Sequence, residues 1–138
     1  NIELKTGGGI YPELEQRVLD LIHRYSVQHD VMITSFDPES LRKVKRLAPE
    51  VTTGLIINAN PSTLLQDLRQ LGASVLSIGY THLSKSLAQQ MIAAGIQIVA
   101  WTIDRESDIR RIAAIDPSIM ICTNHPDRWH RALIGPYA

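Results

Sequence analysis

Short apolar runs alternate with longer segments of helical periodicity along almost the whole chain. The runs are rich in Ile, Val and Leu and alternate only weakly between apolar and polar residues. This pattern is typical of strands that are covered on both faces in a parallel sheet. Six such strands are predicted, over residues 2–5, 31–36, 53–58, 74–78, 97–103 and 120–123.

Between the strands, apolar residues recur every three or four positions. This spacing predicts five amphipathic helices, each with one face for packing on a sheet. The five apolar stripes are Leu14, Val18, Leu21, Ile22 and Tyr25; Leu41, Val44 and Leu47; Leu64, Leu65, Leu68 and Leu71; Leu83, Leu87 and Met91; and Ile109, Ile112 and Ala113.

Capping residues support these boundaries. Asp37-Pro38 predicts an N-cap followed by a first-turn proline, and Asn60-Pro61 repeats the pair. Gly72 and Gly95 fall where a helix is expected to end in a left-handed residue. Gly7–Gly9 is a loop without a phosphate-binding fingerprint around it. No linker interrupts the series, so residues 1–138 are predicted to form a single domain.

Six strand–helix units linked by right-handed crossovers fit two α/β architectures. One is an open doubly wound sheet of flavodoxin-like topology, whose strand order reverses in mid-sheet. The other is most of a closed (β/α)₈ barrel. Both place reacting groups at the carboxyl ends of the strands.

Composition narrows the function classes. Lys and Arg number 14 and Asp and Glu number 14, so no net positive charge attracts nucleic acid. Cys122 is the only cysteine, which excludes an intrachain disulfide and fits a reducing, cytoplasmic location. No run is long enough for a membrane span and no signal peptide opens the chain. The chain begins inside a predicted strand, which suggests a cut chain.

The first strand carries the charged residues Glu3 and Lys5, which are two positions apart. Both therefore project to one face, while Ile2 and Leu4 project to the other. In a barrel, Ile2 and Leu4 would meet the helices. Glu3 and Lys5 are then either an ion pair on an exposed edge strand, or a carboxylate ligand for a hard cation beside a lysine that offsets phosphate charge.

Four segments in order resemble the glycerophosphodiester phosphodiesterases. "NIELK" is similar to that family's "IEIK" strand, and "VMITSFDPESLRKVKRLAPEVTTGLI" to its SF strand, helix and "P-x-x-x-x-G-L" stretch. "AAGIQIVAWTID" is similar to its "G-x-x-V-x-x-W-T" strand, and "IMICTNHPD" to its closing "I-x-T-D-x-P" strand. The resemblance covers nearly the whole chain.

The resemblance implies a (β/α)₈ TIM barrel of the phospholipase-C-like phosphodiesterase type, present here as about six of eight units, with the first two strands absent. It implies hydrolysis of glycerophosphodiesters to an alcohol and glycerol 3-phosphate with a divalent metal, Mg²⁺ or Ca²⁺. Glu3 would be one metal ligand and Lys5 would contact the phosphate. Phe36 and Trp101 would form apolar walls against the substrate, with Ser35 nearby. Without the resemblance, Trp101 would be read as a core residue.

The chain also departs from the family pattern. The family's "HRG" strand, its Glu-x-Asp metal pair and its second histidine precede the "IEIK" strand, so no catalytic histidine is expected in this chain. Asn124 stands where the family has Asp. His23, His29, His82 and His130 are predicted at the surface, and only His125 follows a strand on the active side.

The chain alone is therefore expected to be inactive. The alternatives to an enzyme are a non-catalytic open α/β interaction module or an inactive barrel fragment. Exposed parallel edges would favour association with a second copy or a partner.

Overall fold

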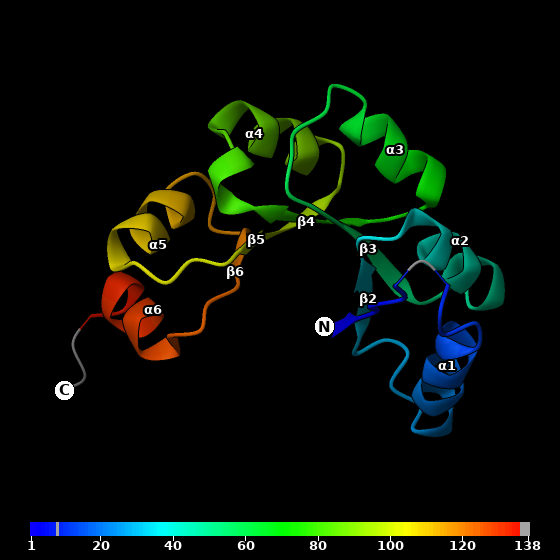
Figure 1. Ribbon diagram of the computed structural model, residues 1–138. Coiled ribbons are helices and arrows are strands. Elements are labelled where there is room, and N and C mark those ends of the chain that lie inside the picture. Colours follow the sequence, from blue (N-terminus) through cyan, green and yellow to red (C-terminus); the bar gives the residue numbers. More distant parts are fainter. Residues whose placement is uncertain (8, 136–138) are drawn as a thin grey trace. The chain divides into compact units, whose positions relative to one another are not determined.

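The computed structural model describes residues 1–7 and 9–135, and strands and helices alternate along it (Figure 1). The strands are β1 (Ile2–Glu3), β2 (Met32–Ser35), β3 (Thr52–Ile57), β4 (Val75–Gly79), β5 (Gln97–Trp101) and β6 (Met120–Ile121). The helices are α1 (Leu14–Arg24), α2 (Pro38–Leu47), α3 (Leu64–Leu71), α4 (Lys85–Ala93), α5 (Glu106–Ala113) and α6 (Pro126–Leu133), with a 3₁₀ turn, η1 (Tyr80–His82), before α4. The six predicted strands and five predicted helices are all present.

The strand order in the sheet is the order in the chain, β1-β2-β3-β4-β5-β6. The pairs β1–β2, β2–β3 and β5–β6 are parallel. A doubly wound sheet requires the order to reverse at a switch point. The flavodoxin-like alternative is therefore wrong, and the order is that of consecutive strands in a (β/α)₈ barrel.

The chain divides into two compact units. The first contains Asn1–Ile57 and Pro61–Leu76, and the second contains Asn58–Asn60 and the chain from Ser77 onward. The division falls inside β4. That residues 1–138 form a single domain stays a prediction.

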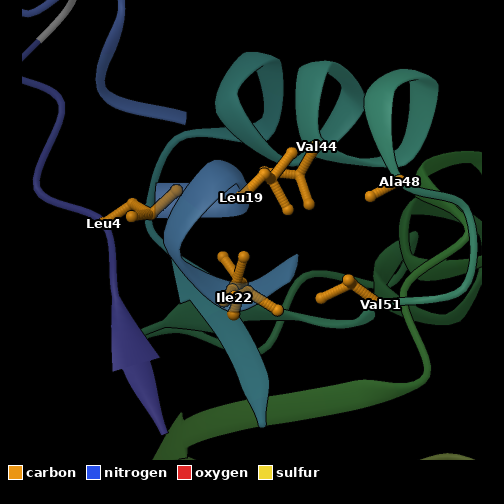
Figure 2. Close-up of a cluster of buried hydrophobic side chains, with 7 residues drawn as sticks. Leu4, Leu19, Ile22, Val44, Ala48 and Val51 are labelled. Carbon is orange, nitrogen blue, oxygen red and sulfur yellow. The ribbon is translucent and has the colours of Figure 1, made fainter. Parts of the chain in front are cut away.

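The core of the first unit lies between the strands and helices α1 and α2 (Figure 2). It combines Leu4 and Ile33 from the sheet side with Leu19 and Ile22 of α1 and Val44 of α2. Burying each aliphatic side chain of this kind contributes about 1.5–3 kcal/mol. Leu4 thus faces the helices, as its alternation with Glu3 and Lys5 predicts, and those two charged residues remain exposed.

The core of the second unit is built from α4, β5 and α5. Its largest fully buried side chains are Ile78 of β4, Met91 of α4, Ile98 of β5, Ile103 in the loop after β5, and Ile109 and Ile112 of α5. On α5, the buried residues are three positions apart, so one helical face is apolar and the other is free for ion pairs.

Three of the predicted helix ends are confirmed. Asp37 caps α2, since its Oδ1 accepts a hydrogen bond of 2.9 Å from the backbone N–H of Glu39. Gly72 and Gly95 have φ angles of 63° and 76°, the left-handed conformation expected after α3 and α4.

Two helix boundaries differ from prediction, and one helix was not expected. Asn60 does not cap α3: the N–H of Leu64 bonds to the carbonyl of Pro61 at 3.1 Å, and this turn delays the helix to Leu64. Leu83 lies before α4, which Ser84 caps by accepting a bond of 3.1 Å from the Leu87 N–H. Finally, α6 was not predicted. Its apolar residues Trp129, Ala132 and Leu133 recur at helical spacing, but the helix is only eight residues long and none of its residues is fully buried.

Candidate active site

Glu3 ends β1 and Lys5 follows it, and both side chains are exposed. β1 is set in register by the parallel pairing of Glu3 with Thr34 of β2. Within residues 1–7 and 9–135, neither Glu3 nor Lys5 has a hydrogen-bond or ion-pair partner. The predicted alternative, an ion pair between the two on an edge strand, is therefore not formed in the described part of the chain.

The two charged residues open onto a pocket of about 570 Å³ at the carboxyl ends of β1 and β2. The pocket brings together four of the five residues that the sequence predicts for the site. It is lined by Glu3, Leu4, Lys5, Thr6, Gly7, Ser35, Phe36 and Asp37. Carboxylate, ammonium and aromatic groups therefore face one space, as recognition of a charged ligand with an apolar part requires.

Ser35 is almost completely buried, with 1% of its surface exposed. Its hydroxyl donates a hydrogen bond of 2.8 Å to the carbonyl of Leu4 and accepts one of 3.1 Å from the N–H of Asp37. The hydroxyl thus joins the end of β1 to the start of α2 beneath the pocket. Its predicted contact with substrate stays a prediction.

Asp37 also lines the pocket, a position that its capping role did not reveal. The Thr6 hydroxyl donates to Asp37 Oδ2 at 2.8 Å. The hydrogen bonds from Thr6 and from the Glu39 N–H outweigh partial desolvation and hold the pKa of Asp37 below its usual range. Asp37 is therefore a carboxylate at neutral pH with both oxygens engaged, which suits it to fixing the loop after β1.

Phe36 lies at the end of β2, directly after Ser35, with 56% of its surface exposed. An aromatic ring this exposed next to charged groups offers an apolar wall to a ligand. The predicted role of Phe36 as such a wall is compatible with this position and is untested.

Trp101 ends β5 in the second unit and is half-buried. The peptide bond between Trp101 and Thr102 is cis. The predicted contact of Trp101 with substrate stays a prediction.

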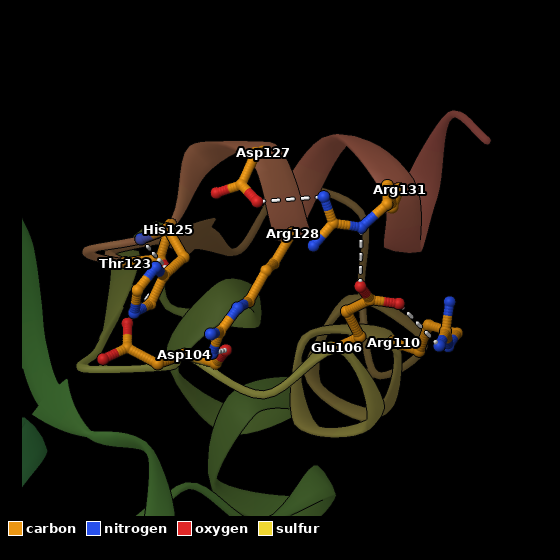
Figure 3. Close-up of polar contacts among 8 residues, drawn as sticks. All are labelled: Asp104, Glu106, Arg110, Thr123, His125, Asp127, Arg128 and Arg131. Carbon is orange, nitrogen blue, oxygen red and sulfur yellow. Dashed lines mark hydrogen bonds and ion pairs between the residues drawn. The ribbon is translucent and has the colours of Figure 1, made fainter. Parts of the chain in front are cut away.

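A second polar cluster lies at the strand ends of the second unit (Figure 3). The Asp104 carboxylate accepts hydrogen bonds from the Thr123 hydroxyl at 3.0 Å, the Asn124 N–H at 2.9 Å and the Asn124 side-chain amide at 3.0 Å. The Asp104 carbonyl accepts a bond of 3.0 Å from Arg128 of α6. This cluster, which we call the Asp104 clamp, was missed in the sequence, because "WTID" gives no sign that its Asp meets the segment twenty residues later.

The Asp104 clamp explains what Asn124 does in place of the family's Asp. Hydrogen bonds from the backbone and side chain of Asn124 hold the pKa of Asp104 below its usual range. A carboxylate at position 124 would repel Asp104 instead. His125 is half-buried beside Asp104, and its backbone N–H donates to the Thr123 hydroxyl at 3.0 Å.

Of the other histidines, His23 and His82 are exposed, as the sequence predicts, whereas His130 is only partly exposed. The His23 ring bonds to Glu50 at 2.8 Å on an exposed surface, and His82 is exposed in η1. His130 belongs to α6 and is half-buried.

A divalent metal would need several oxygen ligands. The described residues contain no group of three or more His, Cys, Asp or Glu side chains placed to hold one. Glu3 fits one ligand position, since its carboxylate is exposed in the pocket without a partner among these residues. Asp37 does not fit, because both of its oxygens are occupied. The described chain thus offers part of a metal site.

The described chain also has no helix long and apolar enough to cross a membrane.

The chain is similar to known glycerophosphodiester phosphodiesterases. A glycerophosphodiester phosphodiesterase from Caldanaerobacter subterraneus subsp. tengcongensis is 30% identical over 129 residues, which are 92% of this chain and 52% of the relative. One from Bacillus subtilis is 26% identical over 136 residues, 91% of this chain and 46% of the relative. The chain spans about half the length of these relatives.

Among solved structures, the chain is similar to an Oleispira antarctica phosphodiesterase in complex with the product sn-glycerol-3-phosphate. The TM-score is 0.80 at 22% identity, over 97% of this chain and 54% of that one. This likeness shows the fold.

The characteristic sequence pattern of the glycerophosphoryl diester phosphodiesterase family matches residues 1–128. Because this match covers nearly the whole chain, the chain belongs to the glycerophosphoryl diester phosphodiesterase family.

Proposed function

We propose that the complete protein containing this chain hydrolyses glycerophosphodiesters to an alcohol and glycerol 3-phosphate with a divalent metal. The observation that carries the proposal is the pocket in which Glu3 and Lys5 are both exposed and without partners among the described residues. Family membership supplies the reaction class.

Lys5 would contact the phosphate. An unpaired ammonium beside the transferring group offsets the charge that develops on its oxygens, without having to break an existing bond first. Phe36 would cover the apolar side of the bound diester. Ser35 and Asp37 would act indirectly, by joining the end of β1 to the first turn of α2.

Members of this family generally depend on a divalent metal. In this chain Glu3 would provide one oxygen ligand, and the choice between Mg²⁺ and Ca²⁺ belongs to the proposal. The metal would supply Lewis acidity toward the phosphate. General acid–base groups would come from outside this chain, so the chain alone would be inactive.

The proposal is tested with the complete protein by measuring release of glycerol 3-phosphate from glycerophosphoethanolamine, with and without chelator. Glu3→Gln should lower kcat/KM by about 100-fold or more, because one metal ligand loses its charge. Glu50→Gln is the matched control, since the exposed Glu50 precedes the amino end of β3, whereas Glu3 lies at the carboxyl end of β1. Wild-type activity in Glu3→Gln would refute the ligand assignment.

Absence of hydrolysis by the complete protein would favour the non-catalytic interaction module. We also propose residence in the cytoplasm and self-association of the isolated chain through its outer strands. The single cysteine supports the first. Light scattering of the purified chain tests the second, and a monomer at micromolar concentration would exclude it.

A further inference from the structure

The loop between β1 and α1 exposes two large apolar side chains next to each other. Ile10 is 67% exposed and Tyr11 is 56% exposed. Single exposed apolar residues are common, but adjoining ones beside a polar pocket are typical of binding surfaces.

Ile10 lies directly against the wall of the pocket. Gly7 lines that pocket, and a methyl group added to Gly7 would lie 2.8 Å from Cδ1 and 3.0 Å from Cγ1 of Ile10. The Ile10 side chain therefore packs on the bare Cα of Gly7. A bound ligand that extends out of the pocket past Gly7 would therefore contact Ile10.

Beyond Ile10 lies a second hollow, of about 440 Å³. It is lined by Ile10, Tyr11, Pro12, Glu13, Leu14 and Arg17. Glu13 and Arg17 form an ion pair of 2.8 Å with each other, so their charges are compensated. The remaining lining is mostly apolar, in contrast to the pocket that holds Glu3 and Lys5.

Polar bonds hold the loop at both ends. Thr6 is bonded to Asp37 at 2.8 Å at the start of the loop. At its end, the Lys43 ammonium bonds to the carbonyl of Pro12 and to the Glu15 carboxylate, the latter at 2.8 Å. A hollow fixed in this way loses little conformational entropy when a ligand binds.

We propose that this second hollow binds the alcohol half of the substrate, and that it selects glycerophosphodiesters whose alcohol carries an alkyl chain. The inference rests on the proposed function and adds the substrate class. With the phosphate at Lys5, the alkyl chain crosses Gly7, contacts Ile10 and ends beside Tyr11 and Leu14. A small polar alcohol such as ethanolamine does not reach Ile10.

The test compares kcat/KM of the complete protein for glycerophosphohexanol and glycerophosphoethanolamine, both followed by release of glycerol 3-phosphate. The wild type should prefer the hexyl diester. Ile10→Ser should lower the hexyl-to-ethanolamine ratio about tenfold, the effect of leaving roughly two methylenes unburied. Tyr11→Ser should lower it less, since Tyr11 lies further along the path.

Matched controls come from the end of α1, where Leu21 of the helix and Tyr25 directly after it are 51% and 70% exposed outside both hollows. Leu21→Ser and Tyr25→Ser should keep the wild-type ratio. Because all four side chains are exposed, circular dichroism should show that all four variants fold.

A ratio that Ile10→Ser leaves unchanged overturns the inference. If Ile10→Ser instead abolishes co-sedimentation of the protein with phosphatidylcholine vesicles and leaves the hexyl-to-ethanolamine ratio unchanged, the inference is also overturned, and the loop is a membrane contact. If the wild type hydrolyses neither diester, the proposed function fails instead. Calorimetry with hexyl phosphate then tests alkyl binding in the second hollow independently of hydrolysis. Binding that weakens about tenfold in Ile10→Ser supports the alkyl site, and equal binding rejects it.

Discussion

The two units place similar residues at their strand ends and use them in opposite ways. In the first unit, Glu3 and Lys5 open into a pocket and have no partner within the described residues. In the second unit, the Asp104 carboxylate accepts three hydrogen bonds from Thr123 and Asn124. A charged residue at a strand end is thus a candidate for binding only where its polar atoms are still available.

The physical reason is the cost of breaking bonds. A carboxylate whose oxygens already accept hydrogen bonds stabilises the fold. It must lose those hydrogen bonds, and the stability that they contribute, before it can bind a ligand. An exposed group without partners gives up only its hydration. We therefore expect changes at Glu3 and Lys5 to affect turnover and changes in the Asp104 clamp to affect stability.

The largest effect should come from Lys5→Gln in the complete protein. It should lower kcat/KM for glycerophosphoethanolamine by about 100-fold, because the charge that offsets the phosphate is lost. The midpoint of thermal unfolding should stay the same, since Lys5 has no partner among the described residues. Arg24→Gln, which removes an exposed cation at the end of α1, is the matched control for both measurements.

A lower thermal midpoint in Lys5→Gln at unchanged turnover would contradict this contrast between the two units. It would make the first unit's charges structural, as those of the Asp104 clamp are.

The next effect concerns Glu15, a buried carboxylate of α1 that the pocket does not use. It accepts hydrogen bonds of 2.8 Å from both Ser40 and Lys43 of α2. Burial alone would raise the pKa of Glu15, but the bonds from Lys43 and Ser40 outweigh it and lower the pKa. Glu15→Ala should lower the free energy of unfolding by about 1–3 kcal/mol, because it leaves the buried Ser40 hydroxyl without its acceptor and removes the carboxylate partner of Lys43.

Urea unfolding at pH 7 measures this change. Glu13→Ala is the control, because the Glu13–Arg17 pair is 70% and 76% exposed and a helix pair of this kind contributes only about 0.2–0.5 kcal/mol. Equal losses in the two variants would show that burial of Glu15 adds nothing.

The fold could be predicted because its signals are local. The apolar stripe of α3, and the left-handed glycines at 72 and 95, depend on neighbours within a turn or two. The stripe predicted for α1 is partly wrong, because Leu21 and Tyr25 are exposed and Leu19 is buried instead. The alternation of Leu4 with Glu3 and Lys5 was enough to separate the core face of β1 from the pocket face.

The clamp and the anchoring of the loop could not be predicted, because they depend on pairs distant in the sequence. Thr6 meets Asp37 across 31 positions, and Asp104 meets Asn124 across 20. α6 was missed for a related reason. Its apolar stripe, Trp129, Ala132 and Leu133, spans only about one turn, and the polar contact of Arg128 with the Asp104 carbonyl joins residues that are distant in the sequence.

Acid should weaken the Asp104 clamp selectively. The pKa of Asp104 is below its usual value in the folded chain, so its bonds contribute stability above the unfolded pKa of about 3.9. That contribution is lost as the pH falls through the lower, folded pKa. The protection of the α6 amides against hydrogen exchange, relative to their intrinsic exchange rates, should therefore decrease as the pH falls below about 4 in the wild type and already be low at neutral pH in Asp104→Ala.

Asp116→Ala serves as the control, since Asp116 has a similarly lowered pKa from Ser118 within its own turn. It should leave the exchange of α6 unchanged. Exchange in α6 that does not depend on Asp104 would show that the helix is held elsewhere.

The smallest effect should come from the ion pairs on the outer surface of α6. Arg131 bonds to Glu106 of α5 and to Asp127 of α6, each at 2.9 Å, and these three side chains are 32–51% exposed. Surface pairs of this kind are screened by salt. Arg131→Gln should therefore raise the exchange of the α6 amides slightly at low salt and not at 0.5 M NaCl. If it released α6 as fully as Asp104→Ala does, α6 would be held by its surface charges. The hydrogen bonds of the Asp104 clamp would then contribute little to holding α6. The claim that the strand-end residues of the second unit stabilise its fold would be wrong.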